Sequence, residues 1–125
     1  DNMNEEKKLV QDKNLLFATV ESKCHHIKVS EKRDEYLKVW VREPTWLEAE
    51  KALNAVMKID AKNQNMDIDL NAMYKYMVQN FVEKTEPSLS QVDLLRLSPF
   101  IGTQLKEILP NPFEAFVDDA TKKEE

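Results

Sequence analysis

The clearest secondary-structure signal in the chain is a strand pattern that leads directly into a helix start. Residues 36–42 alternate between apolar side chains and polar or aromatic ones, as a half-buried β-strand does. The apolar side consists of Leu37, Val39 and Val41. Such a strand needs neighbouring strands for its backbone and a covering layer for its apolar side. The fold must therefore contain a sheet with at least one covered face.

A helix is predicted to begin shortly after this strand, at a capping box. In the segment 45–48, the Thr45 hydroxyl can accept the amide of Glu48, and the Glu48 carboxylate can accept the amide of Thr45. Apolar residues then recur at helical spacing. They are Trp46, Ala49, Ala52, Leu53, Val56 and Ile59. We therefore predict an α+β fold, with an N-terminal antiparallel unit of two or three strands packed on three to four helices.

The predicted β unit covers residues 15–43. An apolar stretch at 15–20 and an alternating one at 26–30 can supply strands beside the one at 36–42. The charged residues 31–35 between them suit a solvent-exposed turn. Because a lone hairpin is marginal in water, this sheet should lie on the helices or on a partner.

Three further helices are predicted in the second half of the chain. Asp67 or Asp69 can cap a helix that ends near Lys84. A second Ser–Asp capping box starts a short helix over residues 90–97. The last helix is predicted over residues 99–109, because proline is favoured in the first turn of a helix.

The chain is expected to be a single domain over residues 1–125. Its length and its hydrophobic content of 42% suit one ordinary core. Within it we expect a polar arm at 1–14, the β unit at 15–43, a helical part at 44–110 and an acidic tail at 111–125.

The charge of the chain argues against nucleic acid as a partner. The chain has 18 Lys and Arg against 23 Asp and Glu, a formal net charge of −5. Phosphate binding needs clustered cations, which the sequence lacks. No apolar run approaches the roughly 18 residues of a membrane span, so no membrane partner is expected. The polar start has no signal-peptide core, and with one cysteine this favours the cytoplasm.

The residues that carry chemistry are few, and no catalytic, cofactor-binding or metal-binding residue is predicted. Gly102 is the single glycine, which excludes glycine-rich phosphate loops. Cys24, His25 and His26 are adjacent, so on an extended segment the two histidines point to opposite faces. A zinc site usually has about four ligands, and no other His or Cys exists to complete one. Adjacent Cys and His also rarely reach the geometry of a nucleophile–base pair.

A family resemblance adds to this interpretation. The stretch 39–48, in which a V-x-V-R-x-x-T strand passes into a capped helix, resembles the small tail assembly chaperones of tailed bacteriophages. The stretch 89–95, followed by 98–109, is similar to their short C-terminal helices. The resemblance implies a non-enzymatic protein that binds the long tape-measure protein and prevents its aggregation during tail assembly. Relatives in contractile-tailed phages act in assembly of the baseplate or hub.

The expected function is therefore that of a phage tail assembly factor in the cytoplasm of a bacterial host cell. We expect a protein partner from the tail or baseplate, and self-association into a homo-oligomer. A structural virion component of the tail or baseplate is one alternative. A small enzyme is the other, although no catalytic constellation supports it.

Aromatic residues and an arginine are the candidates for partner binding. If the sheet covers the core with one face, Tyr36 and Trp40 point outward, and large aromatics are enriched at interfaces. The full candidate set is Tyr36, Trp40, Arg42, Trp46, Phe113 and Phe116. The methionines Met57, Met66, Met73 and Met77 suit either core filling or an adaptable binding groove.

Overall fold

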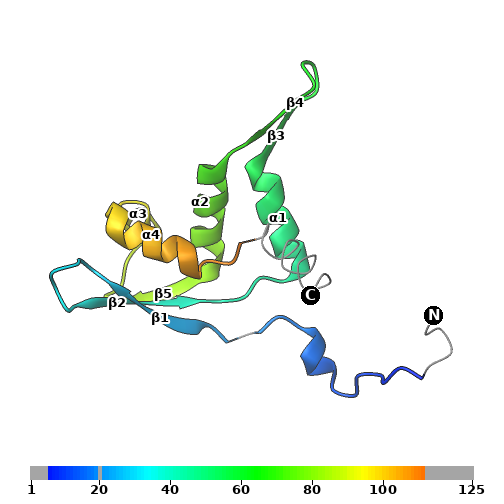
Figure 1. Ribbon diagram of the computed structural model, residues 1–125, viewed down its shortest axis with the longest axis horizontal. Coiled ribbons are helices and arrows are strands. Elements are labelled where there is room, and N and C mark those ends of the chain that lie inside the picture. Colours follow the sequence, from blue (N-terminus) through cyan, green and yellow to red (C-terminus); the bar gives the residue numbers. More distant parts are fainter. Residues whose placement is uncertain (1–5, 20, 112–125) are drawn as a thin grey trace.

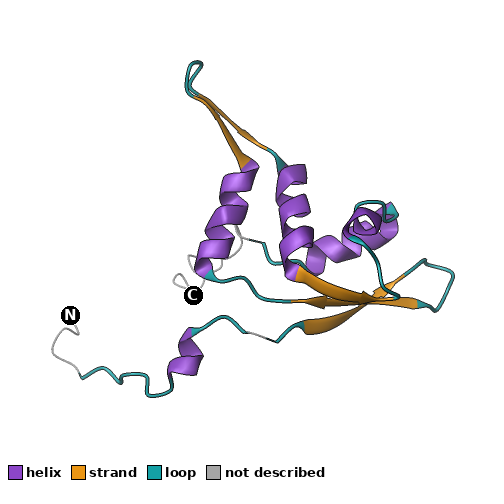
Figure 2. Cartoon of the chain, turned by 180° about the vertical axis from the view of Figure 1, so that it is seen from behind, coloured by secondary structure: helices purple, strands orange, loops and turns teal. Residues whose placement is uncertain are grey.

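The computed structural model describes residues 6–19 and 21–111, and it has the predicted α+β class (Figure 1). The main sheet has three antiparallel strands in the order β1-β2-β5. These strands are β1 (Lys23–Lys28), β2 (Tyr36–Val41) and β5 (Val82–Glu86). The helices are α1 (Trp46–Val56), α2 (Leu70–Phe81), α3 (Gln91–Leu94) and α4 (Pro99–Ile108). Both views show α2 and α4 over the same face of the sheet (Figure 1, Figure 2).

The strand predicted at 36–42 is confirmed, and its alternation decides which face is covered. Leu37, Val39 and Val41 are buried, whereas Tyr36 and Lys38 are exposed. Side chains that pair across the strands share a face, so the cross-strand neighbours of the buried residues also point to the core. The sheet is therefore covered on the side of the helices, and its other side carries mainly exposed side chains.

The third strand differs from the prediction. The β unit was expected within residues 15–43, but β5 comes from residues 82–86, of which 82–84 were assigned to the end of the second helix. Helix α2 stops at Phe81, and the chain continues as a strand beside β2. The helical part at 44–110 therefore also contains strands. Pairing with a segment some 40 positions away decides this, and a local pattern cannot show such pairing.

Residues 15–19, the described part of the segment 15–20, do not form the predicted strand. The 3-10 helix η1 (Lys13–Leu16) includes the first two of them, and none of its residues is buried. The Asp12 side chain accepts the amide of Asn14 at 3.0 Å and so caps this turn. Because a strand needs a partner on at least one side, this apolar stretch does not form a strand, although Phe17 has an extended backbone.

The predicted capping box at the start of α1 is confirmed. The amide of Glu48 donates to the Thr45 hydroxyl at 3.3 Å, and the amide of Thr45 donates to the Glu48 carboxylate at 3.1 Å. Trp46 was expected on the apolar stripe of this helix but is exposed. The stripe becomes buried only from Ala52 onward, where α1 packs against α2.

Replacing Thr45 with alanine should lower the free energy of unfolding by about 1 kcal/mol, because an amide of the first turn loses its acceptor. Urea unfolding followed by circular dichroism measures this change. Thr45→Ser keeps the hydroxyl and serves as the matched control, which should stay within about 0.5 kcal/mol of the parent. Equal losses in both variants would contradict the capping role.

The first helix ends earlier than expected, and a second small sheet follows it. The helical pattern was read through Ile59, but α1 ends at Val56 and continues as β3 (Met57–Asp60). This strand pairs with β4 (Asn65–Ile68), in a region where no strand was predicted. Ile59 fits a helical stripe with Val56 and equally a strand alternation with Met57, and the pairing decides between the two. The β3–β4 hairpin projects from the far end of the α1–α2 pair (Figure 1).

The remaining helix starts agree with the prediction. Asp69 caps α2 by accepting the amide of Ala72 at 3.0 Å. Ser90 and Asp93 form the second capping box, at the start of α3. Helix α4 begins with Pro99 in its first turn.

The core lies between the covered sheet face and the helices. Its largest fully buried side chains are Phe81, Ile27, Met73, Met77, Val39 and Val56. Two of the four methionines considered above, Met73 and Met77, therefore fill the core. Met57 and Met66 do not, since both are exposed.

Candidate protein-binding surface

The N-terminal segment carries apolar side chains that are exposed to solvent and do not pack into the core of the described chain. We call these residues the apolar arm: Leu9, Val10, Leu15, Leu16 and Phe17. Each is between 49% and 76% exposed. The segment extends away from the sheet and helices (Figure 1, Figure 2). A group of exposed apolar side chains on a projecting segment is typical of an interaction site.

The β3–β4 hairpin has a second set of exposed apolar side chains. Met57 pairs with Ile68, so both lie on one face, and Met66 shares that face because it is two residues before Ile68. We call these three residues the hairpin face. All three are exposed. Methionine adapts its shape to different partners, which suits a binding surface.

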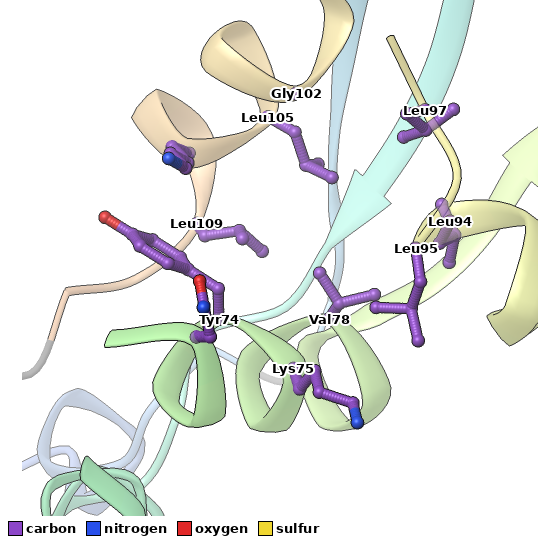
Figure 3. A pocket seen from close by; sticks show the side chains of 11 residues that line it. Tyr74, Lys75, Val78, Leu94, Leu95, Leu97, Gly102, Leu105 and Leu109 are labelled. Atoms are coloured by element: carbon purple, nitrogen blue, oxygen red, sulfur yellow. The ribbon is translucent and has the colours of Figure 1, made fainter. Parts of the chain in front are cut away.

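A groove lies between α2, α4 and the segment around α3. It has a volume of about 370 Å³ and a mainly apolar lining. Figure 3 shows Val78, Leu95, Leu105 and Leu109 converging on this space. Lys75 and Lys106 also line it, and the ammonium of Lys106 lies 5.0 Å from the ring centre of Tyr74. This lining suits a ligand that places an apolar side chain in the groove and a negatively charged group beside Lys75 or Lys106.

The outer sheet face holds the two predicted aromatics. Tyr36 is exposed, and its hydroxyl donates to the Asp34 carboxylate at 2.9 Å, which raises the pKa of Tyr36. Trp40 is half-buried, with the ammonium of Lys84 4.3 Å from its ring centre. The outward orientation predicted for both residues is confirmed. Their role in partner binding stays a prediction.

Arg42 is engaged within its own chain. Its Nη1 donates to Glu48 Oε1 at 2.9 Å, and its Nε donates to the carbonyl of Asn80 at 3.0 Å. The guanidinium also lies 4.7 Å from the ring centre of Phe81. Arg42 therefore joins β2 to α1 and α2, a structural role that the sequence reading missed.

The Arg42–Glu48 ion pair changes the acidity of its carboxylate. Hydrogen bonds from Arg42, and then from the Thr45 amide, lower the pKa of Glu48 to about 2. Hydrogen bonding to Glu48 is likewise the main reason that the pKa of Arg42 is raised.

The remaining candidates for partner binding divide into two groups. Trp46 is 75% exposed on the first turn of α1, and the neighbouring Leu47 is also exposed. Phe113 and Phe116 lie outside the described residues, as does most of the predicted acidic tail.

The Cys24-His25-His26 segment forms part of β1. Cys24 and His26 pair with Trp40 and Lys38, so they share the outer face, while His25 lies on the core side. Partial burial, followed by the charge of Lys23, lowers the pKa of His25. Among residues 6–19 and 21–111, no group of three or more His, Cys, Asp or Glu is placed to hold a metal ion. In the same described part of the chain, no helix has the length and apolar character needed to cross a membrane.

The apolar arm was not identified from the sequence as a binding surface, and for Met57 and Met66 of the hairpin face the sequence left core filling and a binding groove as alternatives. Leu15, Leu16 and Phe17 were assigned to a strand, although three consecutive apolar residues do not alternate as a half-buried strand does. That lack of alternation is the signal that could have marked them.

These surfaces define the class of the protein: an α+β domain with a one-sided sheet, a projecting hairpin and exposed apolar side chains. No protein-family model matches the chain, and comparisons with curated proteins and with solved structures found no similar protein.

Proposed function

We propose that this chain is a non-enzymatic phage tail assembly factor that binds and solubilises a tape-measure-like protein in the cytoplasm of a bacterial host cell. The observation that carries the proposal is the apolar arm together with the hairpin face. Both consist of apolar side chains that lie on projecting elements and are not packed in the core of the chain. The proposal needs no cofactor and no nucleic acid.

The physical properties of these surfaces suit a long, aggregation-prone client. Projecting elements can lie against separate parts of an extended protein, and exposed Met57 and Met66 tolerate different partner shapes. The net charge of −5 keeps a complex with an apolar client in solution through repulsion between like-charged complexes.

A test follows from the apolar arm. A variant with Leu15→Ser, Leu16→Ser and Phe17→Ser should lose most of its ability to suppress light scattering by a tape-measure protein diluted from denaturant. Its thermal unfolding should be unchanged, because none of the three side chains is buried. Replacing Lys7, Lys8 and Gln11 with serine provides the matched control.

The outcome separates this function from others. A second variant, of the hairpin face, carries Met57→Ser, Met66→Ser and Ile68→Ser. The proposal would be overturned if this variant and the arm variant both suppressed aggregation of the tape-measure protein as fully as the parent does. A parent protein that gives no protection would also overturn it.

A structural component of the tail or baseplate is the second candidate. The open outer face with Tyr36 and Trp40 favours it, because such a face suits a permanent neighbour. Mass spectrometry of purified virions distinguishes the two, since an assembly factor leaves the finished particle.

We also propose that the outer sheet face supports self-association. Sedimentation velocity should show an oligomer for the parent chain and a shift towards monomer for Tyr36→Ser combined with Trp40→Ser. Thr103→Ser, on the solvent side of α4, is a control that should not change the distribution. A parent chain that stays monomeric at high concentration would contradict self-association.

A further inference from the structure

Strand β1 is an edge of the main sheet, and its backbone groups alternate in direction. Its one neighbour in the sheet is β2. The amide of Val29 donates to the carbonyl of Glu35 at 3.0 Å, which sets the phase of the antiparallel ladder. The N–H and C=O groups of Cys24, His26 and Lys28 therefore point away from β2.

Gln104 of α4 occupies the end of this edge. The amide of Lys28 donates to Gln104 Oε1 at 3.0 Å, and Gln104 Nε2 donates to the carbonyl of Lys28 at 2.9 Å. One side-chain amide thus makes both contacts that a residue of an added strand would make. Within the described residues, the outward groups of Cys24 and His26 have no such partner.

The charge of the edge indicates what kind of strand it accepts. The strand sequence Lys-Cys-His-His-Ile-Lys has no acidic residue, although the chain as a whole has a net charge of −5. Lys38 lies opposite His26 on the same face, with Glu86 of β5 on its other side. A second copy of β1 would bring together two strands that carry only basic charged side chains, which opposes self-pairing at this edge.

We propose that β1 accepts an extended acidic segment of a partner protein as a fourth strand, which pairs with Cys24 and His26 and stops at Gln104. Main-chain hydrogen bonds bind the segment, and its carboxylates face the lysines and histidines of the edge. A cavity of about 410 Å³, lined in part by Lys23, His25 and Ile108, leaves room on the core side for an apolar side chain of the added strand. Glu21 and Glu43 also line this cavity, so the carboxylates of the segment belong on the outer face. This site is separate from the apolar arm and does not depend on the identity of the client.

Proline substitution at the edge provides the main test. His26→Pro removes an N–H that faces away from β2, and proline is tolerated at such edge positions. The probe is a fluorescent capped peptide of alternating glutamate and valine, measured by anisotropy. We expect binding to the parent and to His26→Ala, and about tenfold weaker binding to His26→Pro. A peptide of alternating lysine and valine should not bind.

A change in the probe keeps the test valid if His26→Pro fails to fold. The glutamate–valine peptide with an N-methyl group at every residue has no backbone N–H left on either edge, so it should lose binding to the unaltered protein. Gln104→Ala frees the groups of Lys28 and should strengthen binding of the parent peptide several-fold.

Several results would overturn the inference. They are equal binding of the methylated and unmethylated peptides, equal binding of the lysine peptide, or no binding of the glutamate peptide. Cross-linking between the Cys24 thiols of two copies that persists in the variant with Tyr36→Ser and Trp40→Ser, without peptide binding, would identify a second copy as the occupant of the edge instead.

Discussion

Replacing Phe81 with alanine is expected to lower the free energy of unfolding by about 3–5 kcal/mol. Phe81 is 0% exposed and lies at the end of α2, where the chain turns into β5. Its ring packs beneath the Arg42 guanidinium and edge-on to Tyr76, with 6.1 Å between the ring centres. The substitution removes apolar contacts and leaves a cavity where the helix, the sheet and the ion pair meet.

Urea unfolding at neutral pH measures this loss. Phe100→Ala is the matched control, because the same side chain is 37% exposed there and should cost about 1 kcal/mol or less. A loss below about 1 kcal/mol for Phe81→Ala would show that Phe81 is not central to the core.

Replacing Arg42 with alanine is expected to cost about 2 kcal/mol at neutral pH. The substitution breaks the ion pair with Glu48, the hydrogen bond to the carbonyl of Asn80 and the contact with the Phe81 ring. Both charged side chains are about a quarter exposed, so solvent screens the pair and keeps the cost moderate. Arg42→Lys should recover less than half of the loss, because lysine cannot reproduce the paired hydrogen bonds that Arg42 Nη1 and Nη2 donate to Glu48 Oε1 and Oε2.

The same ion pair predicts how stability depends on pH. The pKa of Glu48 falls from 4.5 to about 2 on folding, so its contribution is fully present above pH 4.5. The contribution is lost as the pH falls from 4.5 towards 2. We expect this acid-dependent part to be about 1–2 kcal/mol in the parent after screening by solvent.

Urea unfolding at a series of pH values tests this dependence. Arg42→Ala should flatten the decline below pH 4.5, because the main cause of the lowered pKa of Glu48 is then absent. Glu48→Gln should flatten it as well, since glutamine does not titrate. Parallel pH profiles for the parent and both variants would contradict the role of this pair.

The parts of the fold that the sequence determined by itself are those with signals within a few residues. The alternation of Leu37, Val39 and Val41 was sufficient to predict strand β2 and which of its faces is buried. The capping boxes marked the starts of α1 and α3, and Pro99 marked the start of α4. Each signal depends on hydrogen bonds or steric limits between close neighbours in the chain, which makes it readable without the tertiary structure.

The candidate binding site was predictable only in part. The outward direction of Tyr36 and Trp40 followed from strand alternation, and the structure agrees. The exposure of Leu15, Leu16 and Phe17 did not follow, because an apolar run indicates burial unless the rest of the fold leaves it uncovered.

The tertiary structure alone decided the features that join distant segments. It placed residues 82–86 beside β2, paired β3 with β4, seated Arg42 between Glu48 and Phe81, and set Gln104 against the edge at Lys28. Their free energy comes from hydrogen bonds and packing between segments that the sequence separates. A local pattern that fits both helix and strand is therefore resolved only when its partner is in place.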